Sequence, residues 1–310
     1  MTLRIAIGPS TFGAEDDTPR RMLEQAGLEV VPNPHGRRLT EHEIIHHLHD
    51  CDGLVAGLEP LNRRVLASTG HRLKAIARVG IGTTNVDLDA ARELGIKVSN
   101  TPEPPARAVA ELTLGAMICL CRRLVPINAA MHTGEWPKEV TLGLLGARVL
   151  LVGYGRIGRR VGELLRVLGA EVLVCDPELN PDSLLHGERL VTLADGLAEA
   201  EIISLHASGD RCLLGSAEFD RMRRGVFLLN SARGELVDEE ALIDALEAGW
   251  LGGVWFDAFW NEPYAGRLLR FPQVLLTPHV ATYTRQCRLA MEREAVENLL
   301  ADLGITRVRP

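Results

Sequence analysis

The sequence predicts an α/β protein made of two Rossmann-like, doubly wound parallel-sheet domains. Three observations support this fold class. Short apolar runs alternate with helical patterns over nearly all of the 310 residues. These runs fall into two groups, on either side of one long helical stretch. A glycine-rich turn follows one run at a strand-to-helix junction, where such folds bind phosphate groups.

The apolar runs are the expected strands, because continuous apolar runs of this length are typical of parallel strands covered on both faces. The first group covers residues 3–8, 28–31, 53–56, 74–78 and 96–99, and the second covers 148–153, 171–175, 201–206, 226–230, 253–257 and 274–277. Between them, a helix over 105–123 begins at a Pro-Pro pair, a usual helix start. It either bridges two α/β units or packs in the core of one. A last helix is expected over 284–303.

The overall charge argues against a surface for nucleic acid or anionic membranes. Lys plus Arg number 34 and Asp plus Glu 41, which gives a net charge of −7, whereas surfaces that bind polyanions are basic. No apolar stretch reaches the roughly 18 residues of a membrane span, and the N-terminus resembles a first strand rather than a signal peptide. We therefore expect a cytoplasmic protein with a small-molecule partner, no nucleic acid and no membrane.

The cysteines and histidines show no metal-binding pattern. Six scattered cysteines form no Cys-x-x-Cys pair, so we expect reduced thiols, mostly packed in the interior. His42, His46, His47 and His49 lie on a polar predicted helix, and we interpret all four as surface residues. The sequence thus predicts no metal site.

A dinucleotide-binding turn is the most specific motif in the sequence. An apolar strand over 148–152 runs into Gly153, Gly155 and Gly158, spaced as Gly-x-Gly-x-x-Gly, and an amphipathic helix follows. The first glycine permits the tight turn, the second lets a pyrophosphate approach the backbone, and the third lets the helix pack on the strand. The free N–H groups of the helix N-terminus complete a phosphate site. A purely structural turn is the alternative reading.

An acidic residue at the next strand end strengthens this interpretation. Asp176 closes the predicted strand over 171–175. An acid at this place accepts hydrogen bonds from the adenosine ribose hydroxyls and repels a 2′-phosphate. The combination of strand, turn, helix and acid predicts that the chain binds NAD in preference to NADP.

Three polar residues follow apolar strands of the second group. Arg233 comes after 226–230, Glu262 after 253–257, and His279 after 274–277. Open α/β sheets place ligands at the carboxyl ends of their strands. Taken singly, each residue is at least as common in a surface or capping role. Their coincidence with the dinucleotide turn indicates catalysis.

These three side chains form a complete set for hydride transfer to a 2-oxo acid. Arg233 offers a fixed guanidinium fork for the substrate carboxylate. His279 can exchange a proton near neutral pH with the developing alkoxide. A carboxylate beside a histidine, such as Glu262, favours the imidazolium. The residues therefore suggest an NAD-dependent oxidoreductase acting on small 2-hydroxy acids.

Six stretches of the chain, taken in order, form a highly specific set. They are 78–87, 100–102 with 109–112, the turn at Gly153, 230–238, 257–263 and 277–279. This set resembles the D-isomer-specific 2-hydroxyacid dehydrogenase family, and its phosphoglycerate dehydrogenase-like members in particular. The resemblance extends over nearly the full length of the chain.

The resemblance implies a domain organisation and a reaction. Residues 1–99 and 284–310 would form a discontinuous substrate-binding domain, with an NAD-binding Rossmann domain of residues 100–283 inserted between them. The implied assembly is a homodimer. The implied reaction interconverts a small D-2-hydroxy acid and its 2-oxo acid, within EC 1.1.1.-.

The resemblance also assigns roles to single residues. It implies His279 as the general acid/base, Glu262 as its partner and Arg233 as the group that binds the substrate carboxylate. The backbone of Gly80, Ile81 and Gly82 would complete the carboxylate site. The implied NAD contacts are Gly153, Gly155, Arg156, Ile157, Gly158, Asp176, His206, Ala232 and Asp257.

Several loops depart from the family pattern and leave the substrate open. Thr84 stands where the family often has Asp, residues 103–105 read Glu-Pro-Pro, and the segment after His206 is short. Gly57 and Leu58 stand where some phosphoglycerate dehydrogenases carry an Arg. Phosphoglycerate, glyoxylate, hydroxypyruvate and lactate all remain candidates, and the preferred direction of the reaction is open too.

A non-catalytic, NAD-sensing protein of the corepressor type is a second reading of the same residues. Such relatives share the fold and can keep the Arg, Glu and His. No extended tail or disordered arm is evident in the sequence, which favours the enzyme.

Overall fold

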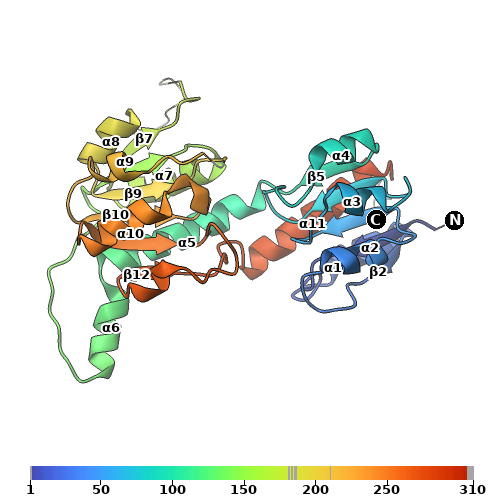
Figure 1. Ribbon diagram of the computed structural model, residues 1–310, viewed down its shortest axis with the longest axis horizontal. Helices are drawn as coiled ribbons and strands as arrows, with labels where there is room; N and C mark the ends of the chain where they lie inside the picture. The colour runs from blue at the N-terminus through green and yellow to red at the C-terminus, as the bar shows by residue number, and fades with distance from the viewer. Residues whose placement is uncertain (1, 181, 183, 185–186, 210, 306–310) are drawn as a thin grey trace. The chain divides into compact units, whose positions relative to one another are not determined.

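The computed structural model describes residues 2–180, 182, 184, 187–209 and 211–305. The chain forms two compact units, each with one parallel sheet (Figure 1). Unit 1 comprises Met1–Pro105 and Tyr283–Pro310, and unit 2 comprises Ala106–Thr282. The chain therefore leaves unit 1, builds unit 2 and returns. The prediction of two doubly wound parallel-sheet α/β domains is confirmed.

The five strands of unit 1 have the order β2-β1-β3-β4-β5, and all pairs are parallel. The strands are β1 (Arg4–Ile7), β2 (Glu29–Val31), β3 (Gly53–Ala56), β4 (Ala75–Arg78) and β5 (Lys97–Asn100). The helices are α1 (Thr18–Gln25), α2 (Glu41–His47), α3 (Arg63–Ala67), α4 (Leu88–Glu93) and α11 (Arg285–Asp302). Helix α11 packs on α1 and on β3, β4 and β5, so the C-terminal segment completes the core of this unit.

The sheet of unit 2 has the order β12-β11-β10-β9-β6-β7-β8, again with parallel pairs. Its strands are β6 (Arg148–Val152), β7 (Glu171–Cys175), β8 (Arg189–Leu190), β9 (Ile202–Leu205), β10 (Val226–Asn230), β11 (Leu251–Phe256) and β12 (Val274–Leu276). Its α-helices are α5 (Pro104–Cys121), which begins at the unit boundary, α6 (Leu124–His132), α7 (Arg156–Val167), α8 (Leu193–Glu199), α9 (Ser216–Phe219) and α10 (Glu239–Glu247). Two short 3₁₀ helices cover Gly234–Leu236 and Arg267–Arg270.

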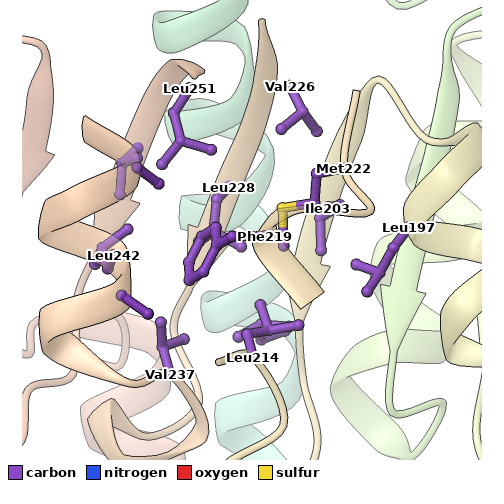
Figure 2. Packing of buried hydrophobic residues seen from close by; sticks show 14 of the residues in the cluster. Leu197, Ile203, Leu214, Phe219, Met222, Val226, Leu228, Val237, Leu242 and Leu251 are labelled. Carbon is purple, nitrogen blue, oxygen red and sulfur yellow. The ribbon is translucent and has the colours of Figure 1, made fainter. Parts of the chain in front are cut away.

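Both faces of this sheet are buried, which explains why its strands lack polar alternation. Leu150, Leu228 and Val254 belong to one hydrophobic cluster, and Leu151, Leu229 and Trp255 to another. Neighbouring residues of a strand point to opposite faces, so each strand needs apolar residues throughout. Figure 2 shows the first cluster, in which side chains from α9, α10 and the strands converge.

Two elements of unit 2 differ from the sequence expectation. The helix expected over 105–123 ends at Cys121, because Arg123 has a left-handed backbone (φ 51°), and α6 starts directly after it. Strand β8 was not predicted, since its two residues are too few to show a period.

Helix α5 also corrects the expectation on membrane spans. It is the single helix, within the described part of the chain, that is long and apolar enough to cross a membrane by length and composition. Half of that window is buried inside the protein. A core helix of this kind passes the same test as a span.

His47 corrects the interpretation of the four histidines as surface residues. His42, His46 and His49 are exposed, but His47 is buried and its Nε2 lies 2.9 Å from the carbonyl oxygen of Ile7. Burial lowers the pKa of His47. The helical pattern was therefore amphipathic, with Ile44 and His47 on the inner side.

Candidate active site

The glycine turn after β6 has the close packing that its spacing predicted. Gly153 has φ +90°, a conformation that favours glycine. A Cβ at Gly153 would lie 2.5 Å from the backbone nitrogen of Ala207, and a Cβ at Gly158 would collide with the carbonyl oxygen of Gly153. Neither position has room for a side chain, so the turn brings β6, the loop after β9 and helix α7 into backbone contact.

Gly155 differs from the other two glycines, because a Cβ there would meet nothing within 4 Å. It is the N-cap of α7 and supplies no side-chain cap to the first N–H groups of the helix. Arg156 and Ile157 are the first residues of that helix. The turn therefore offers open space in front of the first N–H groups of the helix, which have no acceptor within the helix itself, and this suits a pyrophosphate.

Asp176 lies directly after β7 and contacts the same turn. Its Oδ2 accepts the N–H of Tyr154 at 2.7 Å, and its Oδ1 accepts the N–H of Glu178 at 3.0 Å. The side chain is half-buried. A carboxylate has about four acceptor sites, so capacity remains for ribose hydroxyls. The residues present thus fit a dinucleotide with a free 2′-hydroxyl.

His206 and Ala232, two further predicted cofactor contacts, lie at carboxyl ends of neighbouring strands. The N–H of His206 donates to the carbonyl oxygen of Val152 at 2.7 Å, and its Nε2 lies 2.9 Å from Ser204 Oγ. Burial lowers the pKa of His206 to about 4, so this ring is neutral at physiological pH. Its Nδ1 is buried without a partner among the described residues. The N–H of Ala232 is held by Asn230 Oδ1 at 3.0 Å.

The buried carboxylate of Asp257 holds the segment that carries His279. Its Oδ1 accepts the hydroxyl of Thr277 at 2.6 Å and the N–H of Val280 at 3.0 Å, and its Oδ2 accepts the N–H of Ala281 at 3.0 Å. The indole N–H of Trp255 donates to Thr277 Oγ1 at 3.0 Å. From the sequence, Asp257 was expected only among the cofactor contacts. In the structure it is a positioning residue for the loop.

Glu262 and His279 form the pair that the sequence analysis expected. Nδ1 of His279 lies 2.9 Å from both Glu262 oxygens, and Oε1 also accepts the N–H of Phe259 at 3.1 Å. His279 has φ 53°, and its N–H donates to the carbonyl oxygen of Thr277 at 2.9 Å. Both side chains are exposed. The Glu262 carboxylate orients the ring through Nδ1, so Nε2 takes no part in this contact.

Arg233 lies on a loop that touches the loop of Glu262. A Cβ at Gly234 would collide with the backbone at Phe259 and Trp260, and the indole N–H of Trp260 donates to the carbonyl oxygen of Val237 at 2.8 Å. The guanidinium donates to the carbonyl oxygen of Ala232 at 2.6 Å. No carboxylate within the described part of the chain pairs with Arg233, so its charge remains available to an anion.

The Gly80–Gly82 loop follows β4 in unit 1, and it corrects one expectation. The N–H of Gly80 donates to Thr101 Oγ1 at 2.7 Å, so this group is not free for a substrate carboxylate. Asn100 Nδ2 donates to the carbonyl oxygen of Ile81 at 2.7 Å. Among the described residues, the N–H groups of Ile81 and Gly82 have no acceptor. Those two groups remain the candidates.

Sequence reasoning missed Thr277 and Trp255 as members of the catalytic loop network. Thr277 precedes His279 by two residues, and its hydroxyl was a visible signal. The indole of Trp255 belongs to a strand that seemed purely apolar, and nothing in the sequence indicated that it reaches Thr277. No group of three or more His, Cys, Asp or Glu side chains in the described residues is placed to hold a metal ion.

The fold and this site define a dinucleotide-binding oxidoreductase class. Residues 114–281 match the family model described as D-isomer specific 2-hydroxyacid dehydrogenase, NAD binding domain. The chain belongs to this family, and its cofactor is NAD.

Relatives and solved structures agree with this assignment. A hydroxypyruvate reductase of Thermotoga maritima is 31% identical over 94% of this chain and 96% of its own length. The D-3-phosphoglycerate dehydrogenase of Pongo abelii is 33% identical over 88% of this chain, which spans about half of that protein (52%). The crystal structure of the TT0316 protein from Thermus thermophilus has a TM-score of 0.88, 33% identity and 97% coverage of both chains.

Proposed function

We propose that this protein reversibly reduces a small 2-oxo acid to the D-2-hydroxy acid, with His279 as the general acid/base. The observation that carries the proposal is the Glu262–His279 pair, in which both carboxylate oxygens lie 2.9 Å from Nδ1. This is the arrangement in which a carboxylate orients a catalytic histidine.

The protein's own groups divide the work of the reaction. Nδ1–H of His279 donates to Glu262, which leaves Nε2 to give its proton to the substrate oxygen during reduction and to take it back during oxidation. The Glu262 carboxylate lies against the imidazolium while His279 is protonated, and the ring becomes a neutral imidazole when Nε2 gives up its proton. Bound NADH supplies the hydride that C2 of the substrate receives.

Arg233 is the proposed ligand of the substrate carboxylate. It is half-buried, and its planar fork suits a bidentate carboxylate. The side chain of Asn230 holds this loop from both sides, since its Nδ2 donates to the carbonyl oxygen of Arg233 at 2.8 Å and its Oδ1 accepts the N–H of Ala232.

A short 2-oxo acid such as hydroxypyruvate or glyoxylate is the proposed substrate. The similarity to the Thermotoga maritima hydroxypyruvate reductase covers nearly all of both chains, whereas that to phosphoglycerate dehydrogenase covers half of the relative. Gly57 and Leu58 also supply no cation for a phosphate group.

The proposed assembly is a homodimer formed through α6 and the segment that follows it. Helix α6 buries none of its residues. Large apolar side chains are exposed along it and beyond it, at Leu124, Val125, Met131, Trp136, Val140 and Leu145. An exposed apolar surface of this kind marks an interaction site. We propose a cytoplasmic location, in line with the six cysteines, all of which are thiols rather than disulfides.

The test is NADH oxidation by the purified chain with hydroxypyruvate, glyoxylate, pyruvate and 3-phosphohydroxypyruvate, repeated with NADPH. We expect turnover with a short 2-oxo acid, a D-configured product and a strong preference for NADH. NAD binding by calorimetry without turnover of any of these acids would overturn the proposal and favour the NAD-sensing reading. Equal use of NADPH would refute the role given to Asp176.

A further inference from the structure

Helix α2 of unit 1 carries two histidines whose ring nitrogens converge. His42 and His46 are four residues apart, so they share one face of the helix, and both are exposed. Their Nε2 atoms lie 3.2 Å apart. The rings meet edge to face, with centroids 4.5 Å apart and an interplanar angle of 67°.

This contact uses only part of the hydrogen-bonding capacity of the two imidazoles. One Nε2 has to donate and the other has to accept, so the pair shares a single proton. Protonation of both rings would set two N–H donors against each other. A divalent cation between the two nitrogens would use both lone pairs at once.

The spacing of the two nitrogens matches the bite of a tetrahedral metal ion. Zinc–imidazole bonds of about 2.0–2.1 Å at a tetrahedral angle place two ligand nitrogens roughly 3.3 Å apart. The observed 3.2 Å matches this separation, so the two nitrogens need not move apart or together to share one ion. Imidazole nitrogen suits zinc, copper and nickel, whereas magnesium and calcium prefer oxygen ligands.

The pair is accessible from solvent, and the neighbouring side chains do not compete for its ring nitrogens. It opens on a surface hollow of about 580 Å³, which His35, His47 and His49 also line. The neighbouring groups are engaged: Nε2 of His47 contacts the carbonyl oxygen of Ile7, and Nδ1 of His49 lies 3.0 Å from Asp50. The hollow has room for the water molecules that would complete a coordination sphere.

Glu43, the acidic residue of this hollow, is also occupied. Its carboxylate accepts hydrogen bonds from the guanidinium of Arg37, the closer at 2.6 Å, and from Thr40 at 2.9 Å. His35 Nδ1 lies 3.7 Å from the same carboxylate. Since the structure groups no three such ligands anywhere among the described residues, any site here rests on the two histidines.

We propose that His42 and His46 chelate one divalent transition-metal cation of the zinc, copper or nickel type, with water in the remaining positions. Both rings then carry their proton on Nδ1 and present Nε2 to the metal. The neutral pair changes tautomer and releases no net proton.

The test is calorimetric titration of the tag-free protein with zinc chloride in a buffer that does not bind zinc. Removal of any polyhistidine tag is essential, because the tag binds the same ions. We expect the double variant His42→Gln/His46→Gln to bind one zinc equivalent fewer than the wild type. Each single variant should weaken that equivalent by about tenfold or more. Both residues are exposed, so the variants should fold normally.

His49→Gln is the matched control, since His49 lines the same hollow but is engaged by Asp50. It should leave the zinc affinity unchanged. Any zinc bound elsewhere on the protein, for instance at the His279–Glu262 pair, should persist in all four variants. Equal zinc binding by the wild type and the double variant would overturn the proposal.

Copper binding provides a second, spectroscopic measurement that identifies the ligand atoms directly. One equivalent of copper chloride should give an electron paramagnetic resonance spectrum with coupling to two imidazole nitrogens. Each single variant should show one nitrogen fewer. A spectrum identical in the wild type and the double variant would contradict the assignment.

Discussion

The dinucleotide turn and the catalytic loops lie at the same edge of one sheet, but they are built differently. Strands β6, β11 and β12 are parallel members of the unit 2 sheet, so their carboxyl ends share an edge. At the turn, Gly153 and Gly158 bring backbone against backbone with no side chain between. At the catalytic loops, the Asp257 carboxylate accepts the backbone N–H of Val280, and the Glu262 carboxylate contacts the ring of His279.

This difference predicts how each region responds to mutation. A site made of packed backbone tolerates no added methyl group, and changes there act on folding and cofactor binding. A site held by hydrogen-bonded side chains can lose one polar group and keep its fold. Mutations should therefore separate binding from chemistry, and the following predictions test that separation.

The largest effect is expected at His279. His279→Gln removes the proton donor but keeps a polar side chain of similar size. The turnover number should fall by about 10²–10⁴, because general acid–base catalysis contributes that much. Steady-state NADH oxidation with hydroxypyruvate measures this loss.

The cofactor affinity of the same variant serves as its control. NADH binding, followed by protein-to-nicotinamide fluorescence transfer, should match that of the wild type, since His279 lies outside the glycine turn. Loss of NADH binding together with turnover would show that the two regions are not separable in the way we infer.

The glycines of the turn should give two different outcomes. Gly155→Ala places a methyl group in open space, so the protein should fold normally but bind NADH more weakly. An overpacked contact costs about 1–3 kcal/mol, which is roughly 5- to 150-fold in Kd. Gly158→Ala collides with the Gly153 carbonyl and should lower the free energy of unfolding instead.

Urea unfolding and NADH titration of both variants distinguish these outcomes. Gly215→Ala is the matched control for Gly155→Ala, because Gly215 is also a helix N-cap with an extended backbone, and a Cβ there would meet only Glu218 Oε2 at 3.5 Å. It should leave the NADH affinity unchanged. If Gly155→Ala bound NADH as well as the wild type, the open space at the helix N-terminus would not be the pyrophosphate site.

Thr277 should show a smaller effect on turnover. Thr277→Val removes the hydroxyl that donates to Asp257 and accepts from Trp255, while the volume of the side chain stays the same. His279 then loses part of its support, and a misplaced catalytic group lowers the rate. We expect the turnover number to fall by about tenfold with an unchanged KM for NADH.

Thr277→Ser restores the hydroxyl and should recover most of the rate. The intrinsic fluorescence of Trp255 provides a readout of the same hydrogen bond, and its emission should change in the Val variant and return in the Ser variant. Full activity of the Val variant would mean that Asp257 holds the loop without help from Thr277.

The two regions were also unequally readable from the sequence. The glycine turn could be predicted because the spacing of its glycines is typical of one backbone conformation. In the structure, Gly153 and Gly158 pack closely against backbone, and Gly155 faces open space. The catalytic pair could be predicted by residue type and strand position. The role of Trp255 could not, because a strand residue gives no sign of which side chain it meets across the sheet.

Elements failed to be predicted where tertiary contacts outweigh local pattern. Strand β8 is two residues long, and pairing with β7 alone defines it. Gly80 was expected to offer its N–H to a substrate, but Thr101, on the chain after β5, accepts that hydrogen bond instead. His47 follows the same rule, since its partner is a carbonyl of strand β1.

The last predicted effect is on stability rather than on catalysis and concerns His206, which lies beside the glycine turn. Burial lowers its folded-state pKa to about 4, against an ordinary histidine value of about 6.5 in the unfolded chain. Between these values the unfolded chain binds more protons, so the free energy of unfolding decreases as the pH falls from about 6.5 towards 4. The contribution is on the order of 2–3 kcal/mol at the acid end.

His206→Asn should flatten this dependence of the free energy of unfolding on pH, measured by urea unfolding at pH 7.5, 6 and 5. His71→Asn, at an exposed histidine, should leave it unchanged. Equal slopes for the wild type and His206→Asn would mean that the ring gains a proton without cost, and that the loop after β9 opens more readily than its backbone contact with Gly153 indicates.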